Sequence, residues 1–313
     1  MKRSILALTL VTLLAACANI PSPHERRMHA ESLAAARSWH AERLHGGRFD
    51  LAVYLPSRIE AAPVLWVYIE GDGFAWVTPS QPSLDPTPLN PLALRLALAQ
   101  PQGNAAYLGR PCQFVDEDTA SCPQRYWMGA RFAPEVVEAG NQALDALKLR
   151  FGASRLTLVG YSGGGAIAAL LAAHRHDVEA LVTVAGNLDH RAWTMHHRIE
   201  PLSDSLNPAN EIEPLHRVRQ RHFVGGQDRV IPPALVEGFA SRFPGEHRPV
   251  VEHLPGFDHQ CCWVEAWPTL WQNMAETRAP TNGPGSTGRP RDAVPWPERG
   301  DTERLMGQRK SNP

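Results

Sequence analysis

Residues 155–171 read RLTLVGYSGGGAIAALL, and this stretch decides the fold of the chain. Its first part, from Arg155 to Val159, alternates β-branched and aliphatic residues as a buried strand does, whereas the part from Gly163 onward is small and helix-forming. Glycines two residues before and two residues after Ser162 permit a sharp turn between the two parts. The stretch therefore predicts a strand, a tight turn that presents Ser162 at the carboxyl edge of a sheet, and a helix.

An acid and a histidine follow Ser162 at the ends of later predicted strands. Asp228 lies in a loop after the strand-like run that starts at Arg221, and His259 follows the run that ends at Leu254. The separations are 66 residues (228 − 162) and 31 residues (259 − 228), which leave room for intervening αβ units and for one helix. A serine hydroxyl is a weak nucleophile near neutral pH, so it needs an adjacent base and a carboxylate that orients this base.

In this motif and in this order of residues, the chain resembles the α/β-hydrolase superfamily over roughly residues 51–274. The resemblance implies a mostly parallel central sheet with helices on both faces. It also implies Ser162 as the nucleophile, His259 as the general base and Asp228 as the acid that orients the imidazole. Asp189, which follows an earlier strand, is the alternative acid.

A second motif follows the apolar run PVLWVYI, residues 63–69, which is typical of a central strand. The next residues are EGDG, and in α/β-hydrolases the corresponding loop supplies one backbone amide of the oxyanion hole. The resemblance therefore implies Asp72 or Gly73 as one donor and Gly163, directly after the nucleophile, as the other. Glu70 stands where histidine is frequent in the family, and a tight surface turn is the alternative interpretation.

The amino-terminal end of the chain differs in composition from the predicted hydrolase domain. Lys2 and Arg3 precede an apolar run, residues 5–16, which is too short to span a bilayer as a stable helix but is typical of a secretory signal. The run ends in LAAC and resembles the lipobox of bacterial lipoproteins, in which the cysteine, here Cys17, is acylated and becomes the first residue. An ordinary signal peptide with a chance cysteine is the alternative. Since Ala18 follows, the resemblance implies the periplasmic side of an outer membrane.

Export would place the chain in an oxidising compartment, where cysteines form disulfides. Without Cys17, four cysteines are left, and they allow two bridges in three connectivities. A bridge between Cys112 and Cys122 would close a short surface loop. A bridge at Cys261 or Cys262 would brace the loop of the proposed base. A disulfide between these two neighbouring cysteines is sterically unusual. Metal binding at this pair is the alternative.

Composition narrows the function classes. The 313 residues are 43% hydrophobic, which is ample for one α/β domain, and no internal repeat is visible. The net charge of −1 gives no electrostatic reason to expect a nucleic-acid partner. We predict no metal and no cofactor. His196 and His197 are interpreted as polar loop residues, because adjacent side chains on an irregular segment rarely converge on one atom.

The predicted organisation is a single catalytic domain between two segments of different composition. A helix is expected from about Glu25 to Trp39, an irregular proline-rich loop from Trp76 to Asn90, a helix capped by Asn90, and a helix from Pro134 to Phe151. The predicted parts are a signal peptide (1–16), a tether with an amino-terminal helix (17–40), the hydrolase domain (41–276) with a cap-like insert (186–215), and a disordered tail (277–313).

The sequence therefore predicts a serine hydrolase that is exported as a lipid-anchored protein. It would cleave a small-molecule ester, or less readily an amide, through an acyl-enzyme intermediate. Two alternatives stay open: a non-catalytic envelope lipoprotein that uses the fold as a binding module, and a triad-dependent lyase or perhydrolase.

Overall fold

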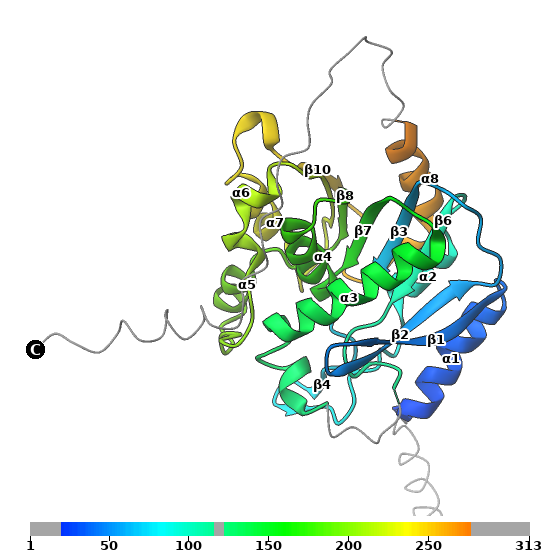
Figure 1. Cartoon of the computed structure of the whole chain (residues 1–313). Helices are drawn as coiled ribbons and strands as arrows, with labels where there is room; N and C mark the ends of the chain where they lie inside the picture. The colour runs from blue at the N-terminus through cyan, green and yellow to red at the C-terminus, as the bar shows by residue number, and fades with distance from the viewer. Residues whose placement is uncertain (1–19, 116–121, 277–313) are drawn as a thin grey trace, which may run out of the picture.

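The computed structural model of the chain describes residues 20–115 and 122–276 (Figure 1). Its strands are β1 (Trp39–Gly46), β2 (Phe49–Pro56), β3 (Val64–Ile69), β4 (Trp76–Thr78), β5 (Gln81–Pro82), β6 (Asn104–Leu108), β7 (Arg155–Tyr161), β8 (Val178–Val184), β9 (Arg219–Gly225) and β10 (Val250–Leu254). Among these residues, eight strands form one sheet in the order β1-β2-β6-β3-β7-β8-β9-β10, and β4 and β5 form a separate hairpin. The sheet is parallel from β6 to β10, whereas β1 and β2 pair in antiparallel fashion.

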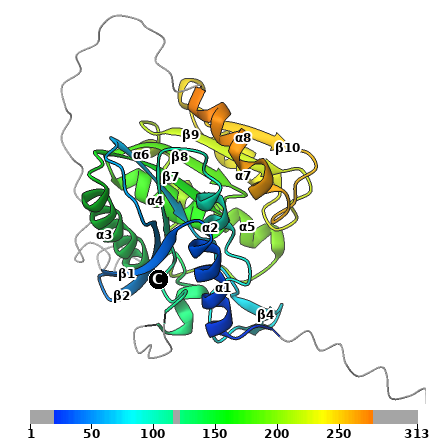
Figure 2. The ribbon, with the colours of Figure 1, turned by 90° about the vertical axis from the view of Figure 1, so that its right-hand side faces the viewer.

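Helices cover both faces of this sheet (Figures 1 and 2). They are α1 (Pro23–Ala35), α2 (Leu92–Leu98), α3 (Pro134–Phe151), α4 (Gly163–His174), α5 (His190–His197), α6 (Ile212–Leu215), α7 (Pro233–Ala240) and α8 (Trp263–Glu276), with 3-10 turns η1 (Gln124–Trp127), η2 (Pro208–Asn210) and η3 (Gly245–His247). Side chains of α3, α4, α6 and α7 share the core on one face, and those of α1, α2 and α8 share the core on the other. Because both faces are covered, the central strands β3 and β7 are apolar runs and do not alternate.

The register of the parallel strands brings their carboxyl ends together. Ile69 at the end of β3 lies opposite Leu108 of β6 on one side and opposite Gly160 of β7 on the other. The alignment continues through β8, β9 and β10. The loops after β3, β7, β9 and β10 therefore open at one edge of the sheet, where ligand sites of open α/β sheets lie.

The first helix ends earlier than the sequence predicted. Helix α1 stops at Ala35, and Trp39 belongs to β1, a strand that the sequence analysis missed. Ser38 has φ 57°, a left-handed conformation that reverses the chain, and its carbonyl oxygen accepts a hydrogen bond from the Ser57 amide. This reversal lets β1 pair with β2 along its whole length, a long-range pairing that helix periodicity does not reveal.

The proline-rich segment after β3 was also predicted wrongly as wholly irregular. It contains the hairpin β4–β5, and Pro82 is tolerated there because a two-stranded ribbon has free edges that need no amide donor. Helix α2 begins at Leu92 without a side-chain cap, so the predicted cap by Asn90 is wrong; the Asn90 side chain accepts a hydrogen bond from Arg95 at 3.0 Å. Helix α3 has the predicted bounds.

The segment predicted as a cap-like insert, residues 186–215, contains α5, η2 and α6. His196 and His197 belong to α5, so their interpretation as loop residues is wrong. The last helix, α8, packs one face into the core: Trp263, Trp267 and Trp271 are at most 5% exposed, and the Trp267 indole donates a hydrogen bond to the Tyr68 hydroxyl.

The predicted signal peptide, Cys17 and the predicted tail (277–313) lie outside the described residues. Within residues 20–115 and 122–276, none of the helices has the length and apolar character needed to cross a bilayer.

Candidate active site

Ser162 occupies the turn between β7 and α4. Its backbone has φ 51° and ψ −121°, a conformation that non-glycine residues rarely adopt. The glycines on either side are required by space: a Cβ on Gly160 would overlap the backbone of Gly164, and a Cβ on Gly164 would overlap the carbonyl oxygens at the end of β3. The strained turn holds the half-buried Ser162 side chain at the carboxyl edge of the sheet.

The structure brings Ser162, His259 and Asp228 into one hydrogen-bonded chain. The His259 Nε2 atom lies 3.0 Å from Ser162 Oγ, and His259 Nδ1 lies 2.8 Å from Asp228 Oδ2. The other Asp228 oxygen accepts the backbone amides of Val230 and Ile231, at 2.8 Å each. The buried carboxylate is thus fixed by its own loop, and one oxygen is left for the imidazole.

Asp189 has a different position. Its Oδ1 atom caps α5 by accepting the amides of Arg191 and Ala192, and it also accepts the Asn207 side-chain amide. Its second oxygen lies 3.6 Å from an Arg242 guanidinium nitrogen. Both carboxylate oxygens of Asp189 therefore have partners other than His259. The geometry favours Asp228 as the partner of the imidazole.

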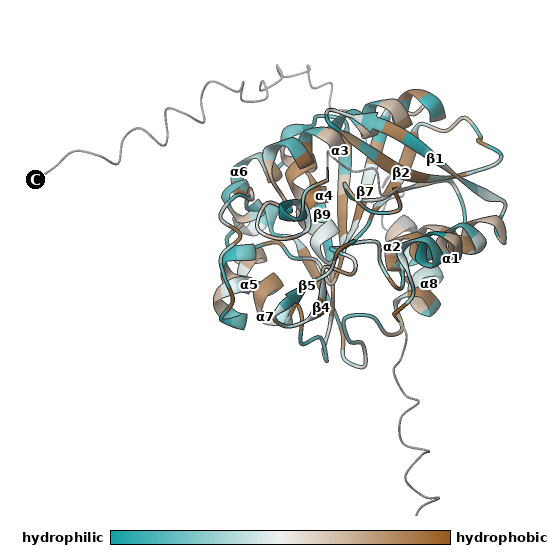
Figure 3. Cartoon of the chain, turned by 90° about the horizontal axis from the view of Figure 1, so that it is seen from below, coloured by the Kyte–Doolittle hydropathy of each residue, from teal (hydrophilic) through white to brown (hydrophobic). Residues whose placement is uncertain are grey.

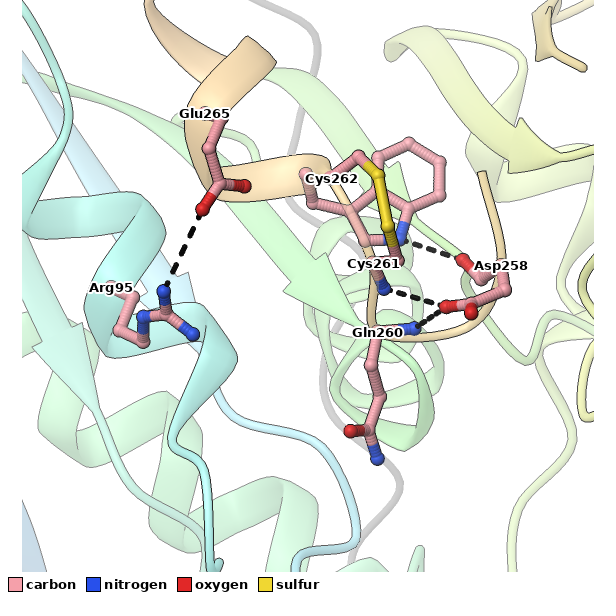
Figure 4. Close-up of a disulfide and its surroundings, with 7 residues drawn as sticks. Arg95, Asp258, Gln260, Cys261, Cys262 and Glu265 are labelled. Carbon is pink, nitrogen blue, oxygen red and sulfur yellow. Dashed lines mark hydrogen bonds and ion pairs between the residues drawn. A yellow bond between two sulfur atoms is a disulfide. The ribbon is translucent and has the colours of Figure 1, made fainter. Parts of the chain in front are cut away.

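The turn that carries His259 is braced from two sides. The Asp258 carboxylate accepts the backbone amides of Gln260 and Cys261, which lowers the pKa of Asp258 (Figure 4). Cys261 and Cys262 form a disulfide with each other directly after this turn, and Cys262 has φ 78°. His259 therefore stands on a short loop whose backbone is held by side chains of the same loop.

The other two cysteines, Cys112 and Cys122, also form a disulfide, as the sequence suggested. The metal alternative at Cys261 finds no support, because no group of three or more metal-ligating side chains occurs among the described residues.

The loop after β3 lies against the nucleophile turn. A Cβ on Gly71 would lie 3.3 Å from Ser162 Cβ, and a Cβ on Gly163 would overlap the Asp72 carboxylate. Asp72 is thus adjacent to Gly163, the residue that follows Ser162. Gly73 has other neighbours, since its α-carbon packs against the Pro86 carbonyl. In the described part of the chain, no acceptor is found for the backbone amides of Asp72 and Gly163.

Two arginines that the sequence analysis missed hold the Asp72 side chain. Arg131 Nη1 lies 2.5 Å from one carboxylate oxygen, and Arg110 Nη1 lies 3.3 Å from the other. Both guanidinium groups are at most 6% exposed. Burial alone would raise the pKa of Asp72, but the two positive charges outweigh it and the pKa is lowered. No sequence signal reveals this cluster, because isolated arginines usually read as surface residues.

Glu70 is buried at the end of β3. One oxygen accepts the Gly71 amide at 2.9 Å and the Ala93 amide at 3.4 Å. The buried Tyr107 hydroxyl interacts with the Glu70 carboxylate, and burial together with the Glu70 charge raises the pKa of Tyr107. Burial raises the pKa of Glu70 to about 7, although the Gly71 amide opposes the shift. Glu70 thus ties down the amide directly before Asp72, a contact that its position after the strand did not reveal.

The comparisons with known proteins bear on the fold. No family model matches the sequence, and no curated protein matches it. Among solved structures, an α/β serine hydrolase without lid from Xanthomonas campestris aligns with a TM-score of 0.51 and 16% identity, over 78% of this chain and 97% of that one. Est1E from Butyrivibrio proteoclasticus aligns with a TM-score of 0.54 and 14% identity, over 77% and 99%.

The esterase domain of a Rhodothermus marinus protein aligns with a TM-score of 0.51 and 13% identity, over 76% of this chain and 97% of that one. Together with the strand order and the turn at Ser162, these similarities show that the chain has the α/β-hydrolase fold, as the sequence predicted. At such identities the comparisons establish the fold, and the reaction has to be argued from the site.

Proposed function

We propose that the chain is a serine hydrolase that cleaves a carboxylic ester, or less readily an amide, through an acyl-enzyme intermediate. The observation that carries the proposal is the hydrogen-bonded chain from Ser162 through His259 to Asp228. A binding module that does not catalyse would gain nothing from aligning these three groups on a strained turn.

In the first half-reaction, Ser162 Oγ attacks the ester carbonyl carbon while His259 Nε2 takes the hydroxyl proton. The carbonyl electron pair moves onto oxygen. When the tetrahedral intermediate collapses, the bond to the leaving alkoxide breaks, and His259 gives its proton to the alkoxide so that an alcohol departs. Asp228 accepts the Nδ1 hydrogen throughout and stabilises the imidazolium.

In the second half-reaction, water replaces the alcohol. His259 Nε2 takes a proton from the water, whose oxygen attacks the acyl carbon, and the collapse returns the proton to Ser162 Oγ. The products are a carboxylic acid and the regenerated enzyme. We assign the oxyanion donors to the amides of Asp72 and Gly163, because these residues adjoin each other beside the nucleophile.

A fluorophosphonate probe tests this proposal, because it labels only an activated serine. Labelling on Ser162 and turnover of a short fluorogenic ester are expected, and Ser162→Ala should abolish both. Ser241 is an exposed serine at the carboxyl end of α7, so Ser241→Ala is the matched control and should behave as the parent. Full esterase activity in Ser162→Ala would refute the proposal. Product analysis separates hydrolysis from the lyase and perhydrolase alternatives.

The proposed export and anchoring are separate from the chemistry. We propose that Cys17 is acylated and that the chain is held at the periplasmic side of an outer membrane. The Cys112–Cys122 disulfide supports an oxidising compartment. Intact-mass analysis of membrane-extracted protein should show a chain that starts at Cys17 and carries added acyl mass. Unacylated protein that starts at another residue would refute the anchor.

A further inference from the structure

Six large apolar side chains stand exposed on four segments: residue 20, residues 76–84, helix α5 and the loop after β9. They are Ile20 (49% exposed), Trp76 (42%), Val77 (37%), Leu84 (94%), Met195 (79%) and Val230 (42%). Exposed apolar residues scattered singly are ordinary, so their gathering is what needs a reason. We call this set the apolar face.

The segments that carry the apolar face lie on one side of the molecule. Figure 3 looks at this side, and it shows the hairpin β4–β5 between α5 on one side and α1 and α2 on the other. Trp193 and His197 of α5 hold the loop of Val230, because their rings bond the Val230 carbonyl oxygen at 2.8 Å each. The hairpin begins four residues after Asp72. The apolar face therefore lies on the side of the molecule where the loop after β3 continues into the hairpin.

A cleft of about 560 Å³ runs between two of these segments. Ile20, Val77 and Leu84 line it, together with Phe74, which follows the oxyanion loop. The one carboxylate in its lining, Asp85, is paired with the guanidinium of Arg26 at 3.3 Å. No residue of the Ser162 triad lines the cleft, so it is an apolar hollow beside the site and is separate from the triad itself.

The distance along the chain limits what can cover this face. Ile20 lies three residues after Cys17, and three residues span at most about 11 Å. If Cys17 carries acyl chains in a bilayer, Ile20 is held within this distance of the lipid surface. Exposed Arg191 and Arg198 on and beside α5 add positive charge next to Met195, which suits anionic headgroups.

We propose that the apolar face docks on a phospholipid bilayer, with Ile20 and the apolar side chains of residues 76–84 inserted between the headgroups. The proximity to the bilayer rests on the proposed acylation of Cys17. Docking in this orientation turns the mouth of the site toward the lipid surface. In this orientation, an ester dissolved in the bilayer has direct access to Ser162. This last step rests on the proposed function.

The test measures contact with lipid directly. The protein as the cell makes it is purified in detergent and reconstituted into vesicles of phosphatidylcholine and phosphatidylglycerol with brominated acyl chains, which quench nearby tryptophans. Quenching is expected, and Trp76→Phe should remove most of it. The double variant Val77→Glu/Leu84→Glu should lose the quenching of Trp76, since it places two charges in the inserted segment.

Leu149→Glu is the matched control, because Leu149 is 85% exposed on α3 near its carboxyl end, which leads into the opposite edge of the sheet. The tryptophan fluorescence of this variant should be quenched as much as that of the parent. All variants should hydrolyse a water-soluble short ester at the parental rate. The double variant should hydrolyse an ester dissolved in the bilayer roughly tenfold more slowly.

Equal quenching in the parent and in the double variant would overturn the proposal. A second copy of the chain that covers the apolar face would also overturn it. In that case, cross-linking between chains would disappear in the double variant, and Trp76 of the parent would not be quenched. Since quenching needs no turnover, a chain without esterase activity would refute the proposed function and would leave the docking result readable.

Discussion

The hydroxyl of Tyr161 donates a hydrogen bond to the main-chain carbonyl oxygen of His259, at 3.1 Å. The two rings also lie against each other, with centroids 5.3 Å apart. Because Tyr161 directly precedes Ser162, this contact joins the turn of the proposed nucleophile to the turn of the proposed base. The separation of Ser162 and His259 therefore depends on Tyr161 as well as on Asp228.

Tyr161→Phe should lower kcat by about three- to tenfold, because it removes one hydrogen bond worth about 1 kcal/mol and keeps the ring packing. Burial raises the pKa of Tyr161, so the hydroxyl stays a neutral donor and the loss should not vary across the neutral range. Steady-state kinetics on a short ester at several pH values measures this. An unchanged kcat would show that Asp228 alone positions the imidazole.

Asp228→Asn and Asp189→Asn should have different effects. Asp228→Asn should lower kcat by on the order of 10⁴ with little change in KM, because the imidazolium loses its carboxylate partner. Asp189→Asn should leave kcat near the parental value and cost at most about 1 kcal/mol of stability, because asparagine also caps helices. Kinetics and urea unfolding of both variants decide this. The reverse order would move the acid to Asp189.

Arg131→Met should destabilise the fold by about 3 kcal/mol, because it leaves the Asp72 carboxylate with only Arg110. It should also lower kcat, since the loop of the proposed oxyanion donor Asp72 loses an ion pair that holds it. The exposed pair Arg150–Glu42 provides the control: Arg150→Met should cost less than about 1 kcal/mol. Urea unfolding measures both, and equal losses would contradict a special role of the Asp72 cluster.

The Asp72 cluster also predicts a pH dependence. The folded-state pKa of Asp72 lies below its ordinary value of 3.8, so its stabilisation is present above that pH. It is lost as the pH falls through the lower folded-state value. Asp72→Asn should therefore flatten the loss of stability in this acid range, as urea unfolding at a series of acid pH values would show.

The raised pKa of Glu70 predicts that the free energy of unfolding depends on pH with the opposite slope at higher pH. Its folded-state pKa of about 7 lies above the ordinary value of 4.5, so the folded state binds more protons between these values. Stability should fall by about 3 kcal/mol as the pH rises through this window and then level off. Glu70→Gln keeps an acceptor for the Gly71 amide and should lack this slope. Parallel pH profiles of parent and variant would contradict the assignment to Glu70.

Local pattern predicted the central elements well. The run from Arg155 through Ser162 into α4 was identified because a strand, a glycine turn and a small-residue helix each leave a signal within a few residues. The strand ends that bring Asp228 and His259 to the same edge were also predicted, since parallel topology aligns carboxyl ends wherever the strands sit in the chain.

Elements whose stability comes from distant partners were missed. The residues of β1 carry no local signal that distinguishes a strand from a continuation of helix α1. They form a strand because they pair with the edge of β2. The hairpin β4–β5 was hidden by its prolines, which forbid central strands but not a free two-stranded ribbon.

The sequence by itself determined the αβ order, the strained serine turn and the chain order of serine, acid and histidine, because each of these is written in short-range pattern. Only the tertiary structure brought Asp228, and not Asp189, beside the His259 imidazole and placed Arg110 and Arg131 around Asp72. Only the tertiary structure buried Glu70 against the Gly71 amide, directly before the proposed oxyanion donor Asp72. The physical reason is that a charged side chain reads as a surface residue in the sequence, and the partners that permit its burial come from elements far away along the chain.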